Sequence, residues 1–169
     1  TVSEEEKDYA DKKIIDHSAD EIPTADAAVL LEAVKEELES DLYKFYVGTS
    51  YRHLLIWQQG QVVDLTPPHD VLGQTVGQYL PEDAVLKEMM KKSYDILVNH
   101  PINVERKKKG QNPANACWFW GAGTRPSLSS FQEKTGLKGA MISAVDLLKG
   151  IAVGASMKNI SVEGANGGL

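Results

Sequence analysis

The sequence has a single cysteine, Cys117, among its 169 residues, and this scarcity excludes an internal disulfide. A chain without disulfides fits a reducing compartment. Cys117 lies in the apolar run at residues 116–120, so we expect a packed thiol rather than a nucleophile. The sequence shows no signal peptide and no apolar run long enough to cross a bilayer, which predicts a cytoplasmic protein without a membrane partner.

Positive charge is also scarce. Lys and Arg number 18 against 24 Asp and Glu, which gives a formal net charge of -6. Nucleic-acid binding depends on clustered Lys and Arg at the phosphates, so this balance argues against a nucleic-acid partner. The one basic run, at residues 106–109, is interpreted as a solvated loop.

Several motifs of catalysis and cofactor binding are absent. There is no G-x-S-x-G nucleophile turn and no Walker A loop, and the Gly-Ala-Gly stretch at 121–123 lacks the third glycine of a dinucleotide site. Asp16-His17 and His69-Asp70 form two separate pairs without the spacing of helical metal ligands. We therefore predict no metal site within this chain.

The sequence does contain the pattern of a compact module over roughly its first hundred residues. A helix is predicted to begin with Thr24 as its N-cap. Residues 42–48 and 51–58, rich in aromatic and β-branched side chains, predict an antiparallel hairpin, with a third strand at 62–63. The proline pair before His69 predicts a rigid extended loop there.

A second helix is predicted over 82–99, ended by Pro101. Its spacing gives an inner stripe of Leu86, Met89, Met90, Ser93 and Leu97.

The remainder has an α/β pattern. Residues 116–120 predict a buried strand that ends in a glycine loop holding Arg125. A capping box at 130–133 and a stop at Gly136 predict a short helix, followed by a buried strand at 139–144 and a helix with Asp146 in its first turn. The predicted fold class is α/β: an α+β module with a mixed or antiparallel sheet over 1–110, then α/β strands over 111–169.

Cations and hydrogen-bond donors are spread over the predicted loops: Arg52 and His53 at the hairpin, His69 after the prolines, and Arg125 after the glycines. Arginine offers paired donors that match phosphate and carboxylate oxygens, so such a set suits a small phosphorylated carboxylate. A surface ion pair is the alternative for Arg52.

Five stretches then resemble, in order, the archaeal-type 2,3-bisphosphoglycerate-independent phosphoglycerate mutases of the alkaline phosphatase superfamily. They read DHSA at 16–19, FYVGTSYRHLL at 45–55, TPPHD at 66–70, HPIN at 100–103 and the long stretch from 112 to 150 that includes WGAG and GLKGAMISAVDLLKG. The family pattern DYSAGHI has Gly-His where this chain has Asp20-Glu21, which leaves His17 as a substitute for the family histidine.

The resemblance implies a glycolytic isomerase about twice this length, of which this chain is the central segment. The phosphate-accepting serine and the ligands of two divalent ions, Mn²⁺ or Mg²⁺, would lie outside it, so no catalytic residue, metal ligand or cofactor is expected within the chain and its partners are phosphoglycerate and the rest of its own protein. Residues 1–110 would be an inserted domain that covers the substrate, and residues 111–169 the return toward the phosphatase core. The expected substrate-binding residues are Asp16, Arg52, His53, His69, Asp70 and Arg125.

Three alternatives stay open. One is a related phosphotransfer or phosphonate enzyme, of the homoserine kinase or phosphonopyruvate decarboxylase type. The others are a non-catalytic binding module and a segment that serves oligomer contacts through its aromatic hairpin.

Overall fold

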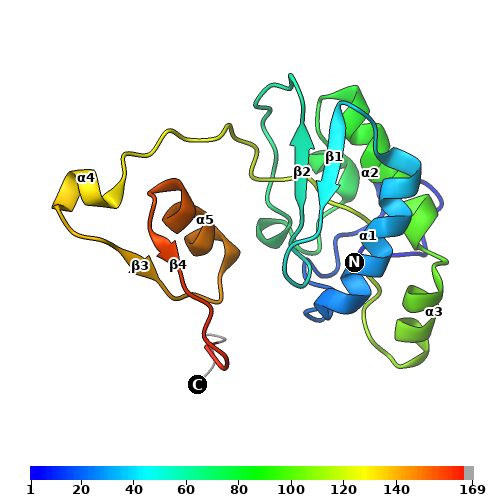
Figure 1. Ribbon diagram of the computed structural model, residues 1–169. Helices are drawn as coiled ribbons and strands as arrows, with labels where there is room; N and C mark the ends of the chain where they lie inside the picture. Colours follow the sequence, from blue (N-terminus) through cyan, green and yellow to red (C-terminus); the bar gives the residue numbers. More distant parts are fainter. Residues whose placement is uncertain (166–169) are drawn as a thin grey trace. The chain divides into compact units, whose positions relative to one another are not determined.

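The computed structural model describes residues 1–165 and divides the chain into two compact units, Thr1–Gly123 and Thr124–Leu169 (Figure 1). The last four residues of the segment predicted at 111–169 lie outside the described part. The division falls later than the boundary predicted at 110, because apolar side chains within residues 114–119 pack against the core of the first unit.

The first unit contains helices and one hairpin. In chain order its elements are η1 (Tyr9–Asp11), α1 (Thr24–Leu38), β1 (Tyr43–Tyr46), β2 (Leu54–Trp57), η2 (Pro68–Asp70), η3 (Val76–Tyr79), α2 (Ala84–Leu97) and α3 (Pro101–Lys108). The strands β1 and β2 pair antiparallel with Tyr43 opposite Trp57, which confirms the predicted hairpin (Figure 1). Residues 62–63 form no strand, so that expectation was wrong.

The helices α1 and α2 pack against each other, and α1 also packs on β1. Apolar side chains of α1 at helical spacing, among them Leu31 and Val34, form one core with Phe45 of the hairpin. The five predicted inner positions of α2 are its five buried residues. Asp83 caps α2, and its carboxylate accepts from the backbone N–H groups of the first turn.

The region after α2 differs from its prediction. Pro101 begins α3 instead of merely stopping a helix, since its missing N–H costs nothing at a first helical position. His100 caps α3 through Nδ1, which accepts from the N–H of Ile102 at 3.3 Å. The basic run forms the last turn of α3, where cations suit the helix dipole. Arg106 in that run is only 5% exposed, so the solvated-loop interpretation was wrong for it.

Residues 116–120 form no strand, in contrast to their prediction. Side chains take the place of strand partners. The N–H of Cys117 donates to the Ser93 hydroxyl at 2.8 Å, and the Trp118 indole donates to the carbonyl of Thr66 at 2.8 Å. Burial raises the pKa of the Cys117 thiol to about 11, in keeping with a packed thiol.

The second unit contains α4 (Phe131–Thr135), β3 (Ala140–Met141), α5 (Asp146–Gly154) and β4 (Lys158–Asn159). The capping box of Ser130 and Glu133 and the left-handed Gly136 are confirmed. The strands β3 and β4 are parallel and α5 packs on both, as a βαβ unit requires. The strand predicted at 139–144 is shorter than expected, and its residues are not buried.

The α/β class is therefore confirmed, with an antiparallel hairpin between helices in one unit and a parallel pair in the other. No helix within residues 1–165 is long and apolar enough to cross a membrane.

Candidate functional site

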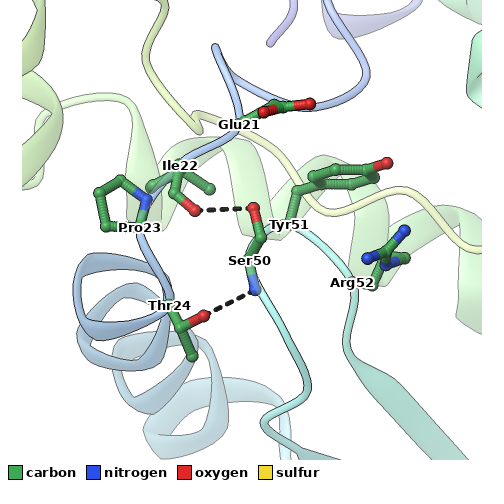
Figure 2. Close-up of a pocket in the computed structure, with 7 residues that line it drawn as sticks. All are labelled: Glu21, Ile22, Pro23, Thr24, Ser50, Tyr51 and Arg52. Carbon is green, nitrogen blue, oxygen red and sulfur yellow. Dashed lines mark hydrogen bonds between the residues drawn. The ribbon is translucent and has the colours of Figure 1, made fainter. Parts of the chain in front are cut away.

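A pocket of about 350 Å³ lies in the first unit, between the segment that enters α1 and the turn of the hairpin. Residues 21–24 form one wall and residues 50–52 the other (Figure 2). Two hydrogen bonds join the walls. The N–H of Ser50 donates to the Thr24 hydroxyl at 2.9 Å, and the Ser50 hydroxyl donates to the carbonyl of Ile22 at 2.8 Å.

These bonds explain why Thr24 does not cap its helix. Pro23 occupies the N-cap position, and the Thr24 hydroxyl accepts from the hairpin instead of from its own first turn. The predicted cap was therefore wrong. The Thr24 hydroxyl, which the sequence pattern assigned to the cap of α1, instead links the two walls of the pocket.

Arg52, predicted as a substrate ligand, lines this pocket. Its guanidinium lies 5.0 Å from the centre of the Tyr51 ring, and its buried Nε has no hydrogen-bond partner within the described residues. The ion pair considered as an alternative for Arg52 does not form among residues 1–165. An arginine held on a ring with unused donors is suited to bind an anionic oxygen.

The opposite wall follows an unusual turn. Ala19, Asp20 and Glu21 have φ values of 51°, 53° and 50°, so three successive non-glycine residues adopt the left-handed conformation. Each such residue costs about 1–2 kcal/mol. The turn needs outside support, and the buried Arg106 provides part of it by donating to the carbonyl of Ala19 at 2.6 Å.

The carboxylate of Asp16, another predicted ligand, provides further support from inside the turn. It accepts from the N–H and hydroxyl of Ser18, from the N–H of Asp20 and from the side-chain amide of Asn112. Partial burial alone would raise the pKa of Asp16, but these hydrogen bonds outweigh it and lower the pKa to about 2. In this structure the carboxylate of Asp16 is occupied in shaping the turn.

A row of aromatic rings starts at Tyr51. The ring of His17 lies 5.5 Å from that of Tyr51 and 5.8 Å from that of His69, and His69 lies 5.3 Å from Trp120. His69 Nε2 is 3.8 Å from the carboxylate of Asp70. The structure thus brings His17, His69 and Asp70 together, although the two Asp-His pairs are far apart in sequence. The prolines place His69 and Asp70 in η2, a turn of 3₁₀ helix, and not in an extended loop as predicted.

His53 follows Arg52 but has a local role in the hairpin. Its Nδ1 accepts from the N–H of Gly48 at 3.2 Å. Partial burial of the ring lowers the pKa of His53 below its ordinary 6.5, which favours the neutral form of the ring. A substrate contact by His53 stays a prediction, with the opposite ring nitrogen as the available donor.

Arg125 belongs to the second unit, where it is exposed on the irregular stretch before α4. Its part in the site stays a prediction. No cluster of three or more His, Cys, Asp or Glu within residues 1–165 could hold a metal ion. The described residues therefore offer no set of ligands for a divalent ion.

Sequence reasoning missed Glu21 and Tyr51 as pocket residues. Glu21 was noted only as a departure from a pattern, and Tyr51 was assigned to a strand. The available signal was the position of Glu21 just before a helix and the position of Tyr51 beside Arg52.

A family profile, curated sequences and a solved structure similar to this chain carry the name phosphoglycerate mutase. Residues 1–103 match the profile of a family described as 2,3-bisphosphoglycerate-independent phosphoglycerate mutase. The curated protein of that name from Methanosarcina barkeri is 44% identical over 162 residues, covering 93% of this chain and 41% of the relative. A solved cofactor-independent phosphoglycerate mutase from Thermoplasma acidophilum is similar with a TM-score of 0.51 at 27% identity, over 82% of this chain and 40% of that one.

A solved protein from Pyrococcus horikoshii has a TM-score of 0.62 at 23% identity over 92% of this chain and 38% of its own, which shows a shared fold. The chain spans about two fifths of the length of the curated relatives it matches.

Proposed function

The chain belongs to the 2,3-bisphosphoglycerate-independent phosphoglycerate mutases, and we propose that the whole protein interconverts 3-phosphoglycerate and 2-phosphoglycerate. Family membership supports the reaction. The pocket with its unpaired Arg52 supports a part in it for this chain, because it offers a small anion a guanidinium with unused donors. This pocket is the observation that carries the proposal.

The first unit would act as the part that covers the substrate. Arg52 binds an anionic oxygen of phosphoglycerate, and His69 with His17 presents ring N–H donors from the neighbouring row. Covering the substrate excludes water that would otherwise hydrolyse a phosphorylated intermediate.

In the whole protein, the nucleophile and the ligands of the metal ions would lie in parts that correspond to the unmatched portions of the relatives. Divalent ions stabilise negative charge on a transferring phosphoryl group when they are bound. Since no metal-ligand cluster occurs within residues 1–165, no step of that chemistry is assigned to residues of this chain. The proposed location is the cytoplasm.

Arg52 provides the direct test. In the whole protein, Arg52→Ala should lower kcat/KM for 3-phosphoglycerate by roughly ten- to over a hundredfold, since one charge-assisted contact contributes about 1.5–3 kcal/mol. Lys87→Ala, which removes an exposed cation from α2, is the control and should leave kcat/KM unchanged. An unaltered kcat/KM in Arg52→Ala removes Arg52 from the site, and a wild-type protein without mutase activity rejects the proposed reaction.

A further inference from the structure

Two side chains of opposite charge line the pocket without pairing. Glu21 and Arg52 stand on its two walls, and no ion pair joins them (Figure 2). Within residues 1–165 the Glu21 carboxylate makes no hydrogen bond, and the Arg52 guanidinium makes none either. A carboxylate and a guanidinium that share a pocket usually neutralise each other when they can meet. Here each remains available to a ligand.

The backbone conformation of Glu21 is held by contacts from other parts of the chain. Glu21 is the third residue of the left-handed turn, a conformation that a glutamate adopts only when its surroundings enforce it. Asp16, Arg106 and Asn112 all bond to the turn and hold it in place. Strain that the rest of a structure over-determines in this way is concentrated at functional sites.

The two walls that carry these charges are also joined to each other. Directly after Glu21, Ile22 is buried, and its carbonyl accepts from the hydroxyl of Ser50. Ser50 lies two residues before Arg52 and is itself left-handed, with φ 56°. The two walls cannot slide past each other without breaking this bond and the one between Ser50 and Thr24.

From this arrangement we infer that Glu21 is a specificity residue that accepts a hydrogen bond from the hydroxyl group of the ligand whose anionic oxygen binds Arg52. An ionised carboxylate can only accept, so the ligand must donate to it. A ligand with anionic groups alone would be repelled by Glu21, whereas a hydroxylated anion satisfies both walls. The inference rests on the proposed function, because phosphoglycerate carries one free hydroxyl beside its anionic groups.

The test compares two ligands in the whole protein: 3-phosphoglycerate and 3-phosphooxypropanoate, which lacks only the C2 hydroxyl. The wild type should bind 3-phosphoglycerate at least about tenfold more tightly, because a carboxylate left without its donor is costly. Glu21→Met keeps the length of the side chain and removes the acceptor, so it should bring the ratio of the two affinities to about one. Arg52→Ala should weaken both ligands and leave the ratio nearly unchanged.

The ratio guards against folding artefacts, since a partly misfolded variant loses affinity for both ligands equally. Glu37→Met, on the exposed face of α1, is the matched control and should keep the wild-type ratio. If Glu21→Met keeps the wild-type ratio while the protein still isomerises 3-phosphoglycerate, the inference is overturned and the proposed function stands. If neither ligand binds the wild type, the proposed function fails and the inference fails with it.

A third ligand separates hydroxyl from ammonium recognition. O-phosphoserine has an ammonium group in place of the C2 hydroxyl and would also donate to Glu21. Binding of phosphoserine more tightly than 3-phosphoglycerate, with that preference lost in Glu21→Met, would overturn the hydroxyl assignment and identify an amino acid phosphate as the ligand of this pocket.

Discussion

Asn112 binds Asp20 through both of its donors. Its backbone N–H donates to one carboxylate oxygen of Asp20 at 2.6 Å, and its side-chain amide donates to the other at 3.0 Å, across 92 residues of sequence. Asp20 is the middle residue of the left-handed turn. This contact therefore fixes the wall of the pocket that carries Glu21.

Removing the Asp20 carboxylate should open that wall. In Asp20→Ala both contacts with Asn112 are lost, and alanine tolerates φ +53° less well than aspartate. We expect faster hydrogen–deuterium exchange over residues 18–22 and a fall of about 1–3 kcal/mol in the free energy of unfolding. Glu37→Ala on α1 serves as the control. Exchange rates equal to those of the wild type would show that the pair does not hold the turn.

Gly48 should be required for the placement of Arg52. A Cβ at this position would collide with the backbone carbonyl of Arg52, which has little room to move within the hairpin turn. Gly48→Ala should therefore displace Arg52, weaken phosphoglycerate binding and lower the melting temperature.

Gly150 in α5 offers the contrasting substitution, because an added Cβ there meets open space. Gly150→Ala should stabilise the protein by up to about 1 kcal/mol through helix propensity. A Gly48→Ala protein that binds and melts like the wild type would refute the steric argument.

Arg106 and Lys108, both in the basic run at residues 106–109, should differ strongly in their contribution to stability. Arg106 is buried and donates to the carbonyls of Ala19 and Asn112, so Arg106→Met leaves both without a partner. We expect a loss of about 2–5 kcal/mol in the free energy of unfolding. Lys108→Met, which removes only an exposed ion pair with Glu105, should change it by less than about 0.5 kcal/mol. Equal effects in chemical denaturation would contradict the assignment.

Acid should release the turn through Asp16. Its folded-state pKa of about 2 lies below the ordinary 3.8, so the ionised carboxylate stabilises the fold above pH 3.8. This contribution is lost as the pH falls from 3.8 toward 2. The difference in unfolding free energy between the wild type and Asp16→Asn should be largest at neutral pH and shrink through that window.

Denaturant titrations across that pH range provide the measurement. Asp11→Asn, at an exposed aspartate of η1, is the control and should show no comparable trend. A difference between the wild type and Asp16→Asn that stays constant with pH would mean that the Asp16 carboxylate is not selectively stabilised in its ionised form.

The sequence by itself determined the elements whose signals lie within a few residues of one another. The capping box of Ser130 and Glu133, the stop at Gly136 and the inner stripe of α2 were all predicted and are all present. Each depends on neighbours three or four positions apart, whose contacts form as soon as the helix does. The hairpin of β1 and β2 belongs to the same group, because its strands are close in sequence.

Only the tertiary structure decided where polar side chains of the first unit would be used. Thr24 bonds to the hairpin instead of capping α1, Arg106 enters the core, and the N–H of Cys117 donates to the Ser93 hydroxyl instead of to a strand. In each case the hydrogen-bond partner is distant along the chain. Local sequence patterns cannot identify such a partner, because only folding brings the donor and the acceptor together. The pocket itself, with Glu21 on one wall and Arg52 on the other, exists only because such long-range bonds hold a strained turn against the hairpin.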